Sequence, residues 1–320
     1  MTNKKLHTKT NAYSCLNMNF NLTILGTGSA IPSFGRFSSA QVLHTHEKSF
    51  LIDCADGTQF QLRKYNVKTN RMNHWFISHL HGDHCFGLIS VISTLGMLHH
   101  TGDIFVHAHP DLHPVLQAQL NYFCKDLPFH VHFEGFNPLK NTVIYEDRSL
   151  SVSTIPLVHS MPTCGFLFKE KEGQPHLNRE LLDFYKVGIE DIKHLKEGAD
   201  FTTEDGKVIP NSRFITPPTP PKSYAYCSDT AYTERIIPII EGVDVLFHEA
   251  TFGESEAFRT KETLHSTAKQ AGIIAQKAGV KQLIIGHYSA RYATLDHLLT
   301  EAKNEFSNTL LSYDGMKHEW

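Results

Sequence analysis

The segment His79-Leu80-His81-Gly82-Asp83-His84 limits what this chain can fold into more than any other part of its sequence. It holds four common metal-binding side chains in six residues, after the short apolar run 74–78 and before the apolar stretch 86–98, which predicts a helix. Loops at strand ends are where α/β folds place ligands and chemistry. The segment therefore predicts a metal site in a strand-to-helix loop. A histidine-rich loop that binds nothing would not need this density of donors.

The spacing within this segment suits two adjacent metal ions. In an extended segment His79 and His81 point to the same side, whereas Asp83 and His84 begin the next turn and can face a second ion. Four donors do not complete two sites, and three further candidates each follow a predicted strand: His159, Asp229 and His287. Each of these is a weak signal alone, but together they have the donor chemistry of a zinc site. An aspartate at position 229, rather than a cysteine, favours an oxygen-rich site for phosphoryl chemistry.

Strands alternate with helices in both halves of the chain, which predicts an α/β protein. Strands are expected at 20–25, 40–44, 49–53, 103–108, 130–133, 150–155, 223–227, 243–248 and 282–286, and helices at 86–98, 110–124, 262–278 and 294–306. This order favours an αβ/βα four-layer sandwich built from two similar halves over a Rossmann sheet, although periodicity alone does not separate them. A dinucleotide fingerprint at Gly26-Thr27-Gly28 is disfavoured, because its third glycine would fall at Ile31 and Pro32 continues a loop.

The chain divides into three expected parts. Residues 1–19 form an N-terminal extension, residues 20–320 the sandwich domain, and residues 169–222 an inserted arm rich in charge, glycine and proline. The 320 residues contain no signal-peptide pattern and no run of eighteen apolar residues, so we expect a cytoplasmic protein with no membrane partner. The six cysteines are scattered, which indicates free thiols.

Several blocks of the chain resemble ribonuclease Z, the tRNA 3′-end processing endonuclease of the metallo-β-lactamase superfamily. The resemblance covers residues 20–95, 156–166 and 223–293, about half of the chain. The matching blocks are Leu25-Gly26-Thr27-Gly28, Ile52-Asp53-Cys54 with Gly57-Thr58-Gln59, Ser78 to His84 with Phe86-Gly87-Leu88, His248-Glu249-Ala250-Thr251-Phe252, His265-Ser266-Thr267-Ala268, and His287-Tyr288-Ser289-Ala290-Arg291-Tyr292. The last three blocks are far more specific than the histidine segment, which the whole superfamily shares.

The resemblance implies a metallo-β-lactamase fold with two zinc ions per chain and a defined role for each site residue. One zinc is held by His79, His81 and His159, the other by Asp83, His84 and His287, and Asp229 bridges both. Asp83 would also accept a proton, and a protonated His265, held by Glu249, would stabilise the leaving oxygen. His248 is expected to be structural. Arg291 is a candidate phosphate contact, with a surface salt bridge as the alternative.

The implied function is an endoribonuclease that removes the 3′ trailer from precursor tRNA. It would leave a 3′-hydroxyl on the tRNA and a 5′-phosphate on the trailer, and the resemblance also implies a homodimer. A metal-dependent phosphodiesterase acting on small substrates is the main alternative. An acyl hydrolase of the lactamase kind is disfavoured by Asp229 and the His265 block, and an RNA-binding module without activity is disfavoured because no proposed ligand is missing.

The arm departs from the family pattern. In bacterial long-arm relatives this segment grips tRNA with basic residues and a Gly-Pro pair, whereas residues 169–222 hold nine basic and ten acidic residues and no Gly-Pro. Because phosphate contacts supply much of the affinity for nucleic acids, the arm is a candidate RNA-binding exosite with a weak electrostatic basis. A solvated insertion is its alternative. The family usually has Gly-Glu where this chain has Ala55-Asp56, and commonly has Asn where it has Phe37. None of these three residues is a proposed ligand.

Overall fold

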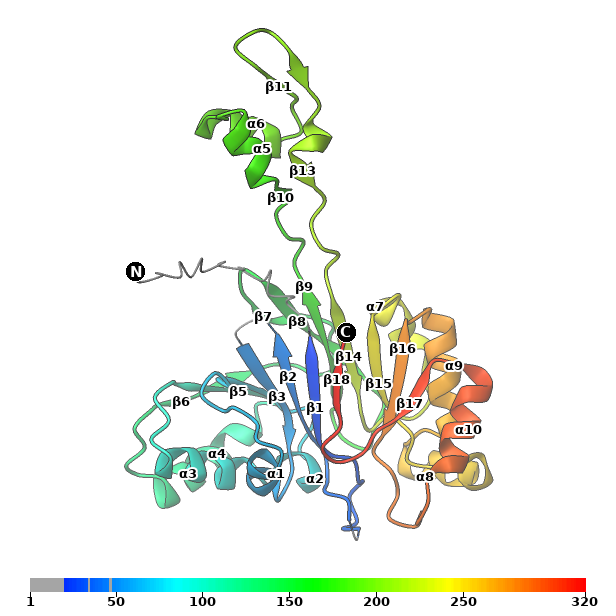
Figure 1. Cartoon of the computed structure of the whole chain (residues 1–320). Helices are drawn as coiled ribbons and strands as arrows, with labels where there is room; N and C mark the ends of the chain where they lie inside the picture. Colours follow the sequence, from blue (N-terminus) through cyan, green and yellow to red (C-terminus); the bar gives the residue numbers. More distant parts are fainter. Residues whose placement is uncertain (1–19, 34, 46–47) are drawn as a thin grey trace, which may run out of the picture.

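Two seven-stranded sheets pack face to face in the computed structural model of the chain, and helices cover the outer face of each sheet (Figure 1). The structure describes residues 20–320 except 34, 46 and 47. The expected extension at residues 1–19 lies outside the described residues. The four layers confirm the αβ/βα sandwich expected from the order of elements along the chain.

The first sheet has the strand order β18-β1-β2-β3-β4-β5-β6. Its strands are β1 (Asn21–Gly26), β2 (Ala40–Thr45), β3 (Lys48–Cys54), β4 (His74–Phe76), β5 (Ile104–Ala108), β6 (Val131–Gly135) and β18 (Lys317–Glu319). Its helices are α1 (Thr58–Lys64), α2 (Gly82–Cys85), α3 (Leu88–Met97) and α4 (Leu112–Phe123). The C-terminal β18 pairs antiparallel with β1, so the end of the chain completes the sheet that its beginning starts.

The second sheet has the order β17-β16-β15-β14-β9-β8-β7. Its strands are β7 (Val143–Glu146), β8 (Leu150–Pro156), β9 (Cys164–Glu170), β14 (Ser223–Cys227), β15 (Val245–Glu249), β16 (Gln282–Gly286) and β17 (Thr309–Leu311). Its helical elements are η2 (Glu234–Ile236), α7 (Ile237–Ile240), η3 (Glu254–Arg259), α8 (Thr260–Thr263), α9 (Ala268–Ala278) and α10 (Asp296–Glu305). Among the described residues, every helix is too short or too polar to cross a membrane.

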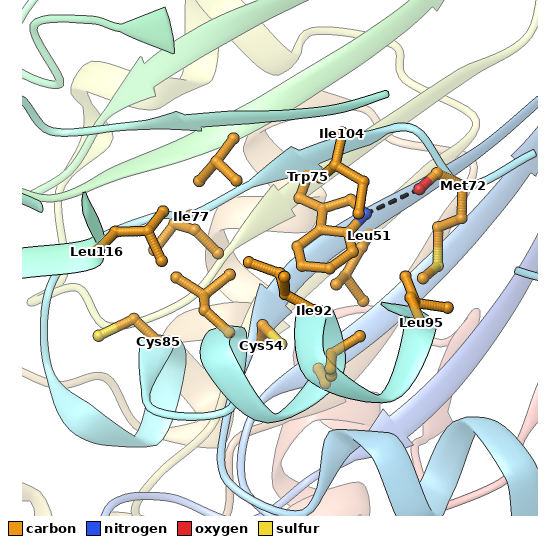
Figure 2. Packing of buried hydrophobic residues seen from close by; sticks show 14 of the residues in the cluster. Leu51, Cys54, Met72, Trp75, Ile77, Cys85, Ile92, Leu95, Ile104 and Leu116 are labelled. Carbon is orange, nitrogen blue, oxygen red and sulfur yellow. Dashed lines mark hydrogen bonds between the residues drawn. The ribbon is translucent and has the colours of Figure 1, made fainter. Parts of the chain in front are cut away.

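Three apolar layers hold the sandwich together. Strand alternation in β1 sends Leu22 and Ile24 into the layer between the sheets, while Leu25 packs towards the helices of the first half. Figure 2 shows this outer layer, in which Trp75 of β4 lies among aliphatic side chains of α3 and neighbouring strands and donates its indole N–H to the carbonyl of Met72 at 2.8 Å. A matching layer packs α7, α9 and α10 on the second sheet.

Replacing Trp75 by alanine is expected to lower the free energy of unfolding by about 3–5 kcal/mol, the usual cost of a large aromatic cavity. Trp75 is fully buried, and the Met72 carbonyl would lose its hydrogen-bond donor. Chemical denaturation followed by circular dichroism measures the change. Tyr122→Ala on α4 is the control, because Tyr122 is 77% exposed and its removal should change stability by less than about 0.5 kcal/mol. Equal effects of the two substitutions would contradict the assignment of the core.

Two helices differ from their expected ranges. The apolar stretch 86–98 forms only α3, because α2 ends at Cys85 and Gly87 approaches the carbonyl of Ala55 too closely for any larger residue. The helix expected at 262–278 is broken. Leu264 has a φ of 55° and ends α8, and Thr267 caps α9 with a reciprocal pair of hydrogen bonds to Gln270. His265 therefore lies in a loop between two helices and not on a helix surface.

The inserted segment projects away from the sandwich as a small separate lobe (Figure 1). Lys169 and Glu170, assigned to the arm from composition, are the last residues of β9, since Lys169 pairs with Ser223. The lobe contains β10 (His176–Leu177), α5 (Arg179–Phe184), α6 (Ile189–Lys196), β11 (Phe201–Thr202), β12 (Val208–Ile209), η1 (Asn211–Arg213) and β13 (Ile215–Thr216). It has its own apolar cluster, formed by Leu182, Leu195, Phe201, Ile209 and Phe214.

Candidate metal centre

The seven ligands expected from the sequence lie together at one edge of the sandwich. Four of them follow β4 and enter α2, and the other three follow β8, β14 and β16. Their donor atoms form two groups, each with all members within 4.8 Å of one another: His79, His81, His159 and Asp229 in one, and Asp83, His84, Asp229 and His287 in the other. Long-range packing of the two sheets thus assembles both sets.

The first set consists of three converging imidazoles. The Nε2 atom of His79 is 3.0 Å from Nδ1 of His81, which is 3.3 Å from Nε2 of His159. The Oδ2 atom of Asp229 lies 3.6 Å from Nε2 of His79 and 3.7 Å from Nε2 of His159. Three nitrogens and one carboxylate oxygen therefore face a common point.

The second set places two imidazoles against two carboxylates. The Oδ1 atom of Asp229 is 3.1 Å from Nε2 of both His84 and His287. The Oδ2 atom of Asp83 is 3.5 Å from Nε2 of His84 and 3.6 Å from Nε2 of His287. Asp229 therefore turns one oxygen to each set, as a carboxylate shared by two ions would.

Whether metal ions fit this site can be judged from the surroundings of the donor atoms of the second set. Oδ2 of Asp83 and Nε2 of His84 and His287 are buried. Although Oδ1 of Asp229 is 3.1 Å from both nitrogens, none of the three atoms makes a hydrogen bond with suitable angles among the described residues. Buried polar atoms without partners are rare because each costs free energy. Divalent cations would satisfy them, and neutral imidazoles together with carboxylates are the donors that zinc uses at catalytic sites. The residues present therefore fit a pair of divalent ions.

The protonation states of His79, His159 and Asp229 agree with this fit. Burial lowers the pKa of His79 well below its usual value, and burial also lowers the pKa of His159, so both rings are neutral with a lone pair to share. Burial alone would raise the pKa of Asp229, but the facing His287 and His84 outweigh it and hold the carboxylate ionised. Neutral imidazole and ionised carboxylate are the forms that bind metal. Burial alone would lower the pKa of His84, but the facing Asp229 and Asp53 outweigh it and raise the pKa well above its usual value, so a bound ion would displace a proton there.

A second layer of hydrogen bonds orients the imidazoles. His84 donates from Nδ1 to Oδ2 of Asp53 at 2.7 Å, and Nδ1 of His159 donates to the carbonyl of Leu264 at 3.1 Å. Nδ1 of His79 is 3.0 Å from the Ser78 hydroxyl, and Nδ1 of His287 is 3.0 Å from the Thr251 hydroxyl. Each of these rings therefore presents Nε2 to the centre, the arrangement that partners of metal-binding histidines impose.

His265 and Glu249 form a pair beside the second set. The Nδ1–H of His265 donates to Oε1 of Glu249 at 2.9 Å, and the same oxygen accepts the backbone N–H of Thr230 at 2.7 Å. The ring centre of His265 is 5.0 Å from that of His159 and 5.4 Å from that of His287. Burial alone would lower the pKa of His265, but the charge of Glu249 outweighs it and raises the pKa to about 9. His265 is thus held as a proton donor with its Nε2 free of protein partners in the described structure.

The side chains of Arg291 and His248 bond to other groups of the protein. Nη1 of Arg291 is 3.1 Å from Oε2 of Glu256, and its Nε donates to the Ser289 hydroxyl at 2.9 Å. The salt bridge offered as the alternative for Arg291 is therefore present. His248 is buried in β15, and its ring bonds the carbonyl of Glu249, in agreement with a structural role.

Asp53 is the main site residue that sequence reasoning did not single out. It is fully buried at the end of β3 and accepts four hydrogen bonds, from His84 and from the Ser78 amide, the Ser78 hydroxyl and the Tyr226 hydroxyl. The sequence offered one signal for Asp53, a charged residue at the end of an otherwise apolar strand. The same strand-end position is occupied by Asp229 and His287, and all three have positive φ, at 56°, 58° and 59°. Such backbone strain clusters at functional sites.

Comparison with known proteins identifies close relatives along almost the whole chain. This chain is 52% identical over 298 residues to a protein named Ribonuclease Z from Phocaeicola vulgatus, and the match covers 93% of this chain and 96% of that protein. It is 50% identical to a Ribonuclease Z from Parabacteroides distasonis, covering 93% and 98%.

Solved structures share the fold at lower identity. The short form of human tRNase Z has a TM-score of 0.68 and 24% identity, with 93% of this chain and 98% of that chain covered. The metallo-β-lactamase fold protein YhfI from Bacillus subtilis has a TM-score of 0.66 and 18% identity, with 95% and 100% covered. These likenesses show the metallo-β-lactamase fold.

One family model matches part of the chain. It is described as Anti-Pycsar protein Apyc1 and matches residues 20–174, slightly less than half of the chain, which include the histidine segment and His159 but not Asp229, His265 or His287. The two ribonuclease Z relatives are 50–52% identical over 93% of this chain, and this much longer match gives the family. The chain belongs to the ribonuclease Z family and is a hydrolytic endonuclease of the metallo-β-lactamase fold.

Proposed function

We propose that the chain is a zinc-dependent endoribonuclease that removes the 3′ trailer from precursor tRNA in the cytoplasm, leaving a 3′-hydroxyl on the tRNA and a 5′-phosphate on the trailer. The observation that carries the chemistry is the position of Asp229, whose two oxygens face two separate ligand sets. Two-metal sites with a shared ligand are common among enzymes that cleave phosphodiesters. The names of the full-length relatives support the choice of a nuclease over a lactamase.

In this proposal His79, His81 and His159 hold one zinc, Asp83, His84 and His287 hold the other, and Asp229 binds both. Zinc at such a site supplies a water of lowered pKa and neutralises charge on the phosphate.

The remaining chemistry belongs to the side chains of this chain. Asp83, ionised and only slightly exposed, accepts the proton of the attacking water. As the bond from phosphorus to the 3′ oxygen breaks, His265 donates a proton from Nε2 to that oxygen, because Glu249 holds the other ring nitrogen and favours the charged ring. The products are a hydroxyl and a phosphate monoester, so atoms and protons balance.

The position of the arm bears on how RNA is held. β14 begins at Ser223, directly after the arm, and Asp229 follows its other end, so the arm and the metal centre lie at opposite ends of one strand. The arm then extends further away (Figure 1). An arm placed this way cannot close over its own site. We therefore propose a homodimer in which the arm of one subunit binds RNA that is cleaved in the other.

The charge of the arm favours a second candidate function. Residues 169–222 carry nine basic and ten acidic side chains, so they lack the excess of positive charge typical of RNA-binding surfaces. A phosphodiesterase acting on small substrates would need the same metal centre and no grip on RNA.

Replacing residues 172–220 by a short Gly-Ser turn separates these functions. Because Glu170 N–H bonds the Lys222 carbonyl, a short turn can join the two strands there. We expect zinc-loaded whole chain to cut a precursor tRNA at the discriminator base, and the armless variant to lose at least about 10²-fold in kcat/KM on that RNA, as when several phosphate contacts are removed. Turnover of a chromogenic phosphodiester should stay within about twofold, which also serves as the control for folding.

Mixing subunits tests the dimer. A full-length Asp229→Ala chain supplies an intact arm without activity, and the armless chain supplies an intact centre, so refolded mixtures should recover tRNA cleavage. If only the small phosphodiester is turned over by the whole chain, the second candidate replaces the first. If the armless chain cuts tRNA as well as the whole chain does, the arm has no role in binding RNA.

A further inference from the structure

His287 is held in an unfavourable backbone conformation at the end of β16. Its φ of 59° lies in the left-handed region, which costs a non-glycine residue free energy and persists only where the surroundings enforce it. The Thr251 hydroxyl orients the ring, and the Thr251 carbonyl accepts the N–H of Ser289 in a long hydrogen bond of 3.3 Å. The loop that follows, residues 287–292, must therefore be held from outside by other contacts.

The loop between β1 and β2 provides the first of these contacts. Tyr288 donates its N–H to the carbonyl of Thr27 at 2.8 Å and accepts the N–H of Ser29 at 3.0 Å. These two hydrogen bonds join the loops side by side next to His287. They involve only Tyr288, and the Tyr292 hydroxyl accepts the N–H of Gly253 at 2.9 Å, so none of these bonds holds the carbonyls of Ser289 and Tyr292.

Arg36 spans the far part of that loop, from Ser289 to Tyr292. Its Nη2 donates to the carbonyl of Tyr292 at 2.8 Å and to that of Ser289 at 3.3 Å. Its Nε is buried without a hydrogen-bond partner among the described residues, so the guanidinium is turned into the protein. Both bonds come from the one nitrogen Nη2, whose two N–H groups are fixed in the plane of a permanently charged guanidinium and so hold the two carbonyls at a set separation. Arg36 thus closes the loop that begins with His287.

We propose that Arg36 is a positioning residue for His287, acting through the carbonyls of Ser289 and Tyr292. This inference rests on the proposed metal centre, in which His287 belongs to the second set. It predicts that Arg36 controls binding of the ion held by Asp83, His84 and His287, and leaves the ion held by His79, His81 and His159 unaffected. The guanidinium is committed to the protein and does not serve as a phosphate contact.

Titration of chelator-treated protein with Co²⁺ alone tests this assignment, because absorption spectra report each binding step without any substrate. His287→Ala first identifies the step that belongs to the second set. Arg36→Met, which keeps the length of the side chain but removes its donors, should weaken that step by about 10-fold, the lower end of the effect of partners of metal ligands. The other step should be unchanged. Arg36→Lys should fall between Arg36→Met and the native protein.

Arg291→Met is the matched control. Arg291 lies in the same loop, but it bonds a side chain of the loop, the Ser289 hydroxyl, and pairs with Glu256. Its removal should change neither step. The inference is overturned if Arg36→Met binds both ions like the native protein, if it weakens both steps equally, or if Arg291→Met has the same effect. Native protein that binds fewer than two ions would instead overturn the metal centre itself, and the inference with it.

Discussion

Replacing Asp229 by alanine is expected to abolish cleavage, with a loss of at least about 10⁴-fold in kcat, the scale seen when one member of a cooperating catalytic set is removed. Among the described residues, Asp229 alone has an oxygen facing each ligand set, at 3.1 Å from His84 and His287 on one side and 3.6–3.7 Å from His79 and His159 on the other. Its removal takes a donor from both sets at once. It also leaves five clustered imidazoles with less compensating negative charge.

The measurement is zinc content after dialysis, together with single-turnover cleavage. We expect about two ions per native chain and substantially fewer than one in Asp229→Ala. Asp126→Ala is the control, since Asp126 is exposed and lies before the start of β6, at the edge of the first sheet opposite the ligands. Removal of one ligand of the first set, by His81→Ala, should also lower zinc content. Full metal and full activity in His81→Ala would show that the assigned centre is wrong.

Replacing His265 by alanine is expected to lower kcat by about 10²–10⁴-fold, the usual contribution of a positioned general acid. His265 lies beside the second ligand set but belongs to neither of the two four-residue sets. It does lie with Glu249 and His287 in a third group of potential donors, but its Nδ1–H is bonded to Glu249, so we expect metal content to stay unchanged. The combination of intact metal and low kcat separates a proton donor from a ligand.

The pH dependence of kcat tests the same role of His265 as a proton donor. Glu249 raises the pKa of His265, so the charged ring persists to higher pH and is lost as pH rises through the raised value. Glu249→Gln removes this charge and should move the alkaline limb of kcat to lower pH, while His265→Ala should have no such limb. Zinc content of both variants, measured in parallel, is the control. An unchanged alkaline limb in His265→Ala would assign that limb to another group.

The order of elements and the ligands at strand ends could be read from the sequence because both depend on local patterns. Alternating apolar residues mark β1 and β2, and histidines after β4 mark a loop with the donors of a metal site. Resemblance to ribonuclease Z supplied the roles of His265 and Glu249, which spacing alone leaves open, and the structure places these side chains in hydrogen-bond contact.

Short elements and loop geometry were harder to predict. The break between α8 and α9 escaped the periodic pattern, because a single left-handed residue, Leu264, interrupts an otherwise helical spacing. That break has a function in the site, since the Leu264 carbonyl orients His159 and the next residue is His265. The small strands of the arm have two residues each, too few to show any alternation.

The sequence by itself determined the fold class, the family and the chemical types of the ligands, because strand periodicity and short motifs are local properties. The resemblance already implied how the ligands divide into two sets, but only the tertiary structure showed that Asp53 supports His84 and that Arg36 faces the loop of His287. These contacts join residues that are far apart in the chain, and they exist because two sheets pack with their strand ends at one edge. The direction of the arm, away from its own metal centre, follows from the same topology, since β14 carries the arm at one end and Asp229 at the other.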